Sequence, residues 1–309
     1  MAMPKVSVII PTFNRRRFLE PAVDSVFAQT YTDWEMIIAD DGSGEDTRSY
    51  LRGIDMPRVR TIWLEHSGNP SRVRNAAINA AKGSYLAFLD SDDVWAPSKL
   101  EKQIKALRDS VTSRWCYTLE DLIDETGRPY VKAGLPTFDP MEGSIFEPLI
   151  QLKVAMSMLT VMADRDLVRE IGGFDEQLLF GEWHDLCLRL ALKSDVVVVR
   201  ESLCSVRIHN EHYSGDKIAE QTGWLQLYKK MTNLVSSREL AAHCARECAT
   251  TSLNIASLQS RQGAYAAGLV TLARALPFSW PYPQWWWGAI KQVVRPIFPK
   301  GLITATRGR

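Results

Sequence analysis

Short apolar runs alternate with longer amphipathic stretches over the first hundred residues. The short runs are rich in β-branched residues and end in polar, turn-forming residues, which predicts strands, and the stretches between them have apolar residues at helical spacing. This alternation is typical of a mostly parallel sheet covered by crossover helices. The predicted strands are Val6–Ile10, Glu35–Asp40, Val59–Leu64 and Tyr85–Asp90, and the predicted helices are Arg17–Ala28, Asp46–Arg52 and Ser71–Ala81.

The pattern changes twice further along the chain. From about Ser113 to Asp216 it is mixed, with predicted strands at 158–164 and 196–200 and a helical stretch at 185–192. After Lys217 it is almost entirely helical, with Arg261, Gln262 and Gly263 as a helix-to-helix turn. We therefore expect one domain over residues 1–216, with halves at 1–110 and 111–216, then a helical appendage over 217–276 and an aromatic and basic tail over 277–309.

Composition narrows the class of protein. The chain has 309 residues, 46% hydrophobic and 24% charged, and its formal net charge of +1 gives no reason to expect nucleic acid as a partner. Five cysteines without paired spacing indicate a reducing compartment. The first apolar stretch runs into Pro11 and resembles a strand rather than a signal peptide, and no apolar span is long enough to cross a bilayer. We expect a cytoplasmic protein.

Three carboxylates follow the fourth predicted strand. Asp90, Asp92 and Asp93 are crowded together, which is unfavourable unless a cation, hydrogen-bond donors or water offset their charge. In extended chain Asp90 and Asp92 project to the same side, and carboxylate oxygens suit Mg²⁺ or Mn²⁺. The alternative is a solvated turn in which Asp92 or Asp93 caps a helix beginning near Pro97. That alternative fits Asp93 well, but Asp90 is so close to the core that it should have a specific partner.

A second acidic pair, Asp40 and Asp41, precedes Gly42 and Ser43 at another strand end. Ligands of open parallel sheets bind beyond the carboxyl ends of the strands, so these polar tips predict a site. The chain has neither a G-x-G-x-x-G opening the first helix nor a P-loop, which argues against those phosphate cradles. If a nucleotide binds here, carboxylates must hold its base and ribose while a metal ion coordinates its phosphates.

Five further segments follow one another along the chain: VSVIIPTFNR (6–15), SVFAQTYTDWEMIIADDGS (25–43), RNAAINAAKGSYLAFLDSDD (74–93), IGGFDE (171–176) and DLCLRLA (185–191). Together, and in the family's order, they resemble glycosyltransferase family 2, whose members have the GT-A nucleotide-binding fold. The resemblance implies an α/β fold with a GT-A, Rossmann-like, mostly parallel sheet flanked by helices, whose residues 1–110 are the nucleotide-binding half and 111–216 the acceptor-facing half. It implies an inverting hexosyl- or N-acetylhexosaminyl-type transferase that moves a sugar from a nucleotide sugar, most often a UDP-sugar, to a saccharide or lipid-linked saccharide in surface polysaccharide biosynthesis.

The resemblance also implies roles for individual residues. Asp90 and Asp92 correspond to the D-x-D motif, and Asp92 and His209 are expected to hold Mn²⁺ or Mg²⁺. The residues expected to bind the nucleotide sugar are Pro11, Thr12, Asn14, Asp41, Arg74, Asp90 and Asp92.

The catalytic base is the point at which the chain departs from the family pattern. In many members the base is the aspartate of a G-E-D-x-D-L segment, whereas this chain has GEWHDL with Trp183 in that position. Glu182 is the leading candidate for the base and Asp185 is its rival, although an acid in the first turn of a helix is also favoured by the helix dipole. His184 is expected to shape the acceptor pocket. Trp183 also leaves open a second hypothesis, a sugar-nucleotide-binding protein that has lost transfer.

The C-terminal tail is aromatic and basic. No acidic residue follows Arg274. Indole rings favour the headgroup level of a bilayer and basic residues favour anionic lipid, so we expect peripheral attachment at the inner face of the cytoplasmic membrane. Alternatively, the tryptophans pack against the helical appendage. The residues concerned are Trp280, Tyr282, Trp285, Trp286 and Trp287, followed by Lys291, Arg295, Lys300, Arg307 and Arg309.

Overall fold

The computed structural model describes residues 5–131, 138–154, 156–209 and 216–294. The chain divides into two compact units. The first comprises Met1–Gln177 and Glu182–His212, and the second comprises Leu178–Gly181 and Tyr213–Arg309. The boundary predicted at residue 216 falls near the start of the long segment of the second unit.

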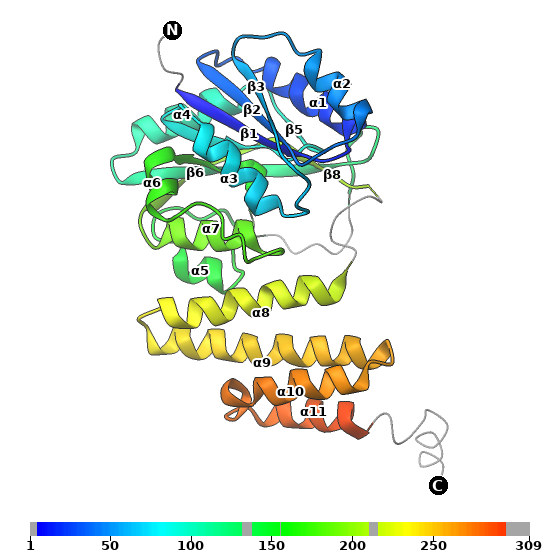
Figure 1. Ribbon diagram of the computed structural model, residues 1–309. Helices are drawn as coiled ribbons and strands as arrows, with labels where there is room; N and C mark the ends of the chain where they lie inside the picture. The colour runs from blue at the N-terminus through cyan, green and yellow to red at the C-terminus, as the bar shows by residue number, and fades with distance from the viewer. Residues whose placement is uncertain (1–4, 132–137, 155, 210–215, 295–309) are drawn as a thin grey trace. The chain divides into compact units, whose positions relative to one another are not determined.

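The first unit begins with the predicted alternation of strands and helices. Its elements are β1 (Val6–Thr12), α1 (Arg16–Phe27), β2 (Trp34–Asp40), α2 (Glu45–Arg52), β3 (Val59–Trp63), α3 (Pro70–Ala80) and β4 (Tyr85–Phe88). The strands are parallel neighbours in the order β3-β2-β1-β4 (Figure 1). Helices cover this part of the sheet, so apolar residues on both faces of β1 and β2 are fully buried, as in other parallel sheets. The α/β prediction is confirmed.

The remainder of the first unit extends the same sheet. Its elements are β5 (Val94–Trp95), α4 (Lys99–Asp109), β6 (Ser113–Ile123), α5 (Phe146–Ile150), η1 (Met158–Thr160), β7 (Met162–Asp164), α6 (Arg165–Glu170), α7 (Glu182–Ala191) and β8 (Asp195–Arg207). The eight strands of the described chain lie in the order β3-β2-β1-β4-β7-β6-β8-β5. β7 is antiparallel to β4 and β6, β8 is parallel to β6, and β5 is antiparallel to β8. The segment predicted as one strand at 158–164 is a 3₁₀ turn followed by β7.

The acidic loop lies between two paired strands. β4 precedes it and β5 follows it, and Val94 of β5 pairs with Ser205 of β8. The helix predicted near Pro97 is α4, and its N-cap residue is Ser98. Asp92 and Asp93 are both buried, so the alternative of a solvated turn with either acid as the helix cap is wrong.

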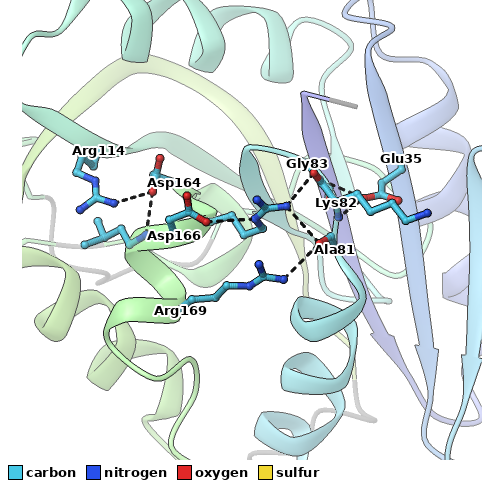
Figure 2. A network of polar contacts seen from close by, with 11 residues as sticks. Glu35, Ala81, Lys82, Gly83, Arg114, Asp164, Asp166 and Arg169 are labelled. Atoms are coloured by element: carbon cyan, nitrogen blue, oxygen red, sulfur yellow. Dashed lines mark hydrogen bonds and ion pairs between the residues drawn. The ribbon is translucent and has the colours of Figure 1, made fainter. Parts of the chain in front are cut away.

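The amino ends of the strands are tied together by a separate polar network (Figure 2). Glu35 of β2 accepts a hydrogen bond from the backbone N–H of Lys82, at 2.6 Å. Arg165 of α6 donates to the carbonyl of Lys82 at 2.8 Å, and Asp164 accepts from Arg114 at 2.8 Å. These contacts join the end of α3 to β2, β6 and α6. They lie at the edge of the sheet opposite the acidic loop.

The second unit contains four helices in its described part, α8 (Lys217–Leu234), α9 (Arg238–Arg261), α10 (Tyr265–Ser279) and α11 (Pro283–Val294). α9 ends at Arg261 and Gly263 adopts φ 81°, so the predicted turn is confirmed. The predicted start of the tail, residue 277, lies inside α10. A small apolar core joins α9, α10 and α11 and includes Ala256, Leu272 and Trp285.

The tryptophans near the C-terminus have different environments. Trp285 is buried, and its Nε1 donates to the carbonyl of Ala249 at 2.9 Å, as the packing alternative predicts. Trp280 and Trp287 are exposed, at 75% and 69%. Within the described ranges, none of the helices combines the length and apolar character that a bilayer crossing requires.

Candidate active site

The candidate site is formed where β1, β2 and β4 end. Loops after parallel strands meet at one edge of the sheet, which brings the PTFN, DDGS and DSDD segments together. α7 and the end of β8 supply the remaining side chains. The site therefore combines residues that are far apart in sequence, such as Asp92 and His209, which are 117 positions apart.

Asp41 organises the loop after β3. Its Oδ1 accepts hydrogen bonds from the N–H and hydroxyl of Ser67, both at 2.9 Å, and its Oδ2 accepts from the N–H of Gly68 at 2.9 Å. Gly42 allows this approach with φ +80°, because a Cβ there would lie 2.8 Å from the backbone nitrogen of His66. Asp41 thus fixes the loop at the edge where the nucleoside is expected.

The end of β1 has two features typical of a binding site. Asn14 adopts φ 53°, which is uncommon for a residue other than glycine, and its Oδ1 accepts from the N–H of Gly44 at 2.7 Å. Thr12 Oγ1 is buried and has no hydrogen-bond partner among the described residues. A buried hydroxyl of this kind needs a partner, and a bound ligand would supply one. Pro11 lies beside Ala39 of β2 in the same register.

Arg74 connects two of the predicted site carboxylates. It donates to Asp90 Oδ1 at 2.7 Å and to Glu182 Oε1 at 3.0 Å. Burial alone lowers the pKa of Arg74, but the charges of Asp90 and Glu182 outweigh this effect and the pKa is raised. Burial also raises the pKa of Glu182, against the opposing influence of Arg74. Both carboxylates are thereby held on one buried guanidinium.

Asp92 and Asp93 face different partners. Asp92 Oδ2 accepts from Arg15, and His209 Nε2 lies 3.0 Å from the same oxygen. Asp93 Oδ1 accepts from the N–H of Arg207 at 2.8 Å. The pKa of Asp93 is raised well above its usual value by burial and by the neighbouring negative charges. Burial and the nearby carboxylates therefore favour the protonated, neutral form of Asp93 more than in a free carboxyl group.

Asp185 and His184 point into the interior. Asp185 is fully buried and its Oδ2 lies 2.6 Å from an Nη of Arg189. Arg189 also donates to the carbonyls of Ile171 and Gly173, so the pair ties α7 to the IGGFDE segment. His184 is buried, and burial lowers its pKa to about 4, so it is neutral at pH 7. Its ring packs edge-on against Trp183 at 5.1 Å. The expectation that His184 shapes the acceptor pocket stays a prediction.

Several site residues are absent from the sequence-based list. Arg207 holds the acidic loop, because its Nε donates to the carbonyl of Asp92 at 2.9 Å. Phe13 and His66 stack with ring centroids 4.0 Å apart at the ends of β1 and β3. Phe13 lies inside the PTFN segment, so a closer interpretation of that segment could have included it. Nothing local in the sequence marks Arg207.

Asp92 and His209 are the candidate metal ligands that lie together. Among the described residues, no group of three or more His, Cys, Asp or Glu side chains is arranged to hold a metal ion. A cation bound through one or two protein ligands and the phosphates of a substrate does not need such a group. The two side chains therefore fit a cation that binds together with a nucleotide diphosphate.

Comparison with known proteins identifies the family. The family described as Glycosyl transferase family 2 matches residues 7–138. A Bacillus subtilis protein named as a teichuronic acid biosynthesis glycosyltransferase, TuaG, is 35% identical over 170 residues, which cover 54% of this chain and 65% of that protein. The chain belongs to glycosyltransferase family 2.

A second relative is named for a lipid-linked acceptor. The Escherichia coli UDP-Glc:alpha-D-GlcNAc-diphosphoundecaprenol beta-1,3-glucosyltransferase WfgD is 36% identical over 102 residues, which cover 33% of this chain and 40% of WfgD. The chain spans less than two thirds of the length of these relatives.

Solved structures agree on the GT-A fold. Staphylococcus aureus TarS 1–349 in complex with UDP-GlcNAc superposes with a TM-score of 0.68 at 18% identity, covering 94% of this chain and 88% of that one. The mannosyltransferase PcManGT from Pyrobaculum calidifontis, in complex with GDP-Man and Mn²⁺, gives a TM-score of 0.60 at 17% identity. The superposition covers 97% of this chain and 89% of that one. At these identities the likeness concerns the fold alone, and the predicted GT-A architecture is confirmed.

Proposed function

We propose that this family 2 member is an inverting glycosyltransferase that moves a hexosyl or N-acetylhexosaminyl group from a UDP-sugar to a saccharide or lipid-linked saccharide in surface polysaccharide biosynthesis. One observation carries the proposal. Arg74 joins Asp90 of the D-x-D motif to Glu182 of α7, so the predicted donor-binding and base carboxylates share one side chain. The names of TuaG and WfgD support the acceptor class, and the UDP-GlcNAc complex of TarS supports the donor class.

For the donor, we assign the nucleoside to the edge formed by Pro11, Thr12, Asn14 and Asp41. The buried hydroxyl of Thr12 supports this assignment, because it has no hydrogen-bond partner in the described part of the chain and a ribose or base would supply one. Asp41 contributes by fixing the loop that borders the same edge.

For the cofactor, we propose that Asp92 and His209 hold Mn²⁺ or Mg²⁺. Their contact at 3.0 Å and the acidic surroundings support this assignment, and the Mn²⁺ in the PcManGT structure supports the choice of metal. When bound, the cation offsets the charge that develops on the departing nucleoside diphosphate.

For the base, we propose Glu182. It removes the proton from the acceptor hydroxyl as that oxygen attacks the anomeric carbon, while the bond from this carbon to the diphosphate oxygen breaks. The raised pKa of Glu182 suits a general base. Asp185 is better explained by its buried pair with Arg189, which holds α7 in place.

Transfer assays with the full chain test this proposal. UDP-Glc, UDP-GlcNAc and GDP-Man are incubated with Mn²⁺, and slow release of free sugar is followed without an acceptor. We expect release from a UDP-sugar, its loss in excess EDTA, and its loss in Asp92→Asn with an unchanged circular dichroism spectrum. Full activity in EDTA would contradict the metal assignment.

A second assay addresses the base. With a working donor, we expect Glu182→Gln to lower kcat about 10²- to 10⁴-fold, the usual contribution of a general base, with little change in donor KM. Asp185→Asn is the comparison variant, and its folding is checked by circular dichroism because Asp185 pairs with the partly buried Arg189. If Asp185→Asn shows that signature and Glu182→Gln is near normal, the assignment is wrong.

The alternative function is a sugar-nucleotide-binding protein without transfer. Trp183 favours it, because an indole cannot take the proton that the aspartate of the family pattern would take. Tight UDP-sugar binding with no hydrolysis of any donor is the outcome that distinguishes this alternative from the enzyme.

We also propose that the C-terminal helices contact the inner face of the cytoplasmic membrane. The exposure of Trp280 and Trp287 supports this proposal, as does the absence of Asp and Glu from residues 248–309. Co-sedimentation with anionic liposomes tests it. We expect Trp280→Ala/Trp287→Ala to bind more weakly than the unchanged chain, and binding of the unchanged chain to fall at high salt. Equal binding by both proteins would remove these tryptophans from the mechanism.

A further inference from the structure

Three consecutive arginines lie at the start of α1, and each has a different acidic partner. Arg16 and Arg17 are exposed, and their partners lie outside the candidate site. Arg15 alone among the three contacts the D-x-D motif. The pairs are Arg15 with Asp92, Arg16 with Asp46 at 2.7 Å, and Arg17 with Glu125 at 3.3 Å.

Arg15 binds the oxygen that the proposed cation also needs. Asp92 Oδ2 accepts from Arg15 and lies 3.0 Å from His209 Nε2, so the guanidinium and a cation on this pair would be close neighbours. Two positive charges at that separation repel each other strongly when partly buried. Arg15 and a divalent cation therefore compete for Asp92.

Arg15 is also the most exposed of the three arginines that contact the site carboxylates or the acidic loop. Its side chain is 23% exposed, whereas that of Arg74 is 8% exposed and is held by two carboxylates. Arg207 is buried and fixed by backbone carbonyls. Arg15 precedes the first residue of α1 and has non-helical φ and ψ, so its side chain is not confined by a helical turn.

We propose that Arg15 is an exchangeable counter-ion of Asp92: it gives this carboxylate up to the divalent cation and then binds the diphosphate of the donor. A planar guanidinium matches phosphate oxygens well, and Arg15 follows Asn14 at the end of β1, the edge assigned to the nucleotide. The inference rests on the proposed function and adds a coupling between its two ligands. Cation binding alone costs Arg15 its contact with Asp92, whereas cation and diphosphate together give it a new contact, so each ligand strengthens binding of the other.

Mn²⁺ binding to the full chain, measured by electron paramagnetic resonance with and without UDP, tests the exchange. In Arg15→Ala we expect Mn²⁺ alone to bind about fivefold more tightly, because the cation no longer has to displace a partly exposed ion pair. With Mn²⁺ saturating, we expect UDP to bind about tenfold more weakly, because a charge-assisted contact is lost. Arg15→Gln, which keeps most of the side-chain volume, should show the same two changes and replaces the alanine variant if that variant folds poorly. These opposite changes in two affinities are not expected of a residue that only stabilises the fold.

Arg16→Ala and Arg17→Ala are the matched controls, because each removes one positive charge from an adjacent position. We expect both to stay within about twofold of the unchanged chain, as screened surface charges do. The inference is overturned if Arg15→Ala leaves Mn²⁺ affinity unchanged or lowers it, or if either control matches it. If the unchanged chain binds neither Mn²⁺ nor UDP, the proposed function fails and the inference fails with it.

Discussion

Replacing Arg74 by methionine removes the guanidinium that holds two site carboxylates while keeping an unbranched side chain. Glu182 is 10% exposed at its side chain and would be left as a buried carboxylate without its counter-ion. Breaking a buried pair in this way costs ~3–5 kcal/mol. The side chain of Asp90 is 32% exposed, so water screens its share of the loss. We therefore expect Arg74→Met to lower the free energy of unfolding by about 3 kcal/mol, the lower end of that range.

The stability lost in Arg74→Met should depend on pH in a defined direction. Burial raises the pKa of Glu182 and Arg74 opposes that rise, so removing Arg74 raises the pKa further. A carboxyl group with a higher pKa in the folded than in the unfolded state destabilises the fold as pH rises through the folded-state pKa. Below the usual pKa of glutamate both states bind the proton and the penalty disappears. The loss in Arg74→Met should therefore be smaller at pH 5 than at pH 8.

Amide hydrogen exchange of peptides from α3 and α7 measures the local free energy of opening, after correction for the intrinsic exchange rate at each pH. A double-mutant cycle with Glu182→Gln isolates the pair, because a neutral amide at position 182 needs no counter-ion. In the Glu182→Gln background we expect Arg74→Met to cost only about 1 kcal/mol, the value of an ordinary hydrogen bond. Equal costs in both backgrounds, together with no pH dependence, would refute the reasoning.

Three further predictions concern the scaffold. Asp185→Asn should destabilise the chain by about 3 kcal/mol in urea unfolding, because it leaves the cation of Arg189 buried. Gly83→Ala should lower the thermal midpoint strongly, since its Cβ would lie 2.5 Å from the backbone nitrogen of Ser7, whereas Gly53→Ala, with its nearest atom at 3.3 Å, should change it little. The five cysteines should react with a thiol reagent at pH 8 only after unfolding, because burial raises the pKa of four of them to about 12 and of the fifth to about 11; rapid reaction of the native chain would contradict this. The cysteines are Cys116, Cys187, Cys204, Cys244 and Cys248.

The first half of the sheet could be predicted from the sequence because its signals are local. Each strand from β1 to β4 is a short apolar run that ends in turn residues, and the observed ends differ from the predicted ones by at most two residues. β7 and β5 were harder, since they are three and two residues long and exist only through pairing with distant strands. Periodicity within a window cannot detect such pairing.

The site was predictable as a set of residues but not as a set of contacts. The D-x-D acids and Arg74 could be named from motifs, yet nothing local indicates that Arg74 would bind Glu182, which is 108 positions away. The alternative that Asp93 caps a helix was wrong, because its carboxylate instead accepts a hydrogen bond from the N–H of Arg207 in β8. Arg15 likewise has no local signal in the sequence, because its partner Asp92 comes near it only in the folded chain.

The two edges of the sheet also suggest how such a chain can change over evolutionary time. At the amino edge, Glu35 and Asp164 are bound to backbone N–H groups and to Arg114 in a network that joins several elements (Figure 2). At the carboxyl edge, the site side chains come from the loops that follow the strands and from α3, α7 and β8. A substitution among the site side chains leaves the contacts of the amino-edge network in place. Substrate range can therefore drift while the scaffold is inherited unchanged, and a designer seeking a new donor should vary the carboxyl edge and leave the network around Lys82 intact.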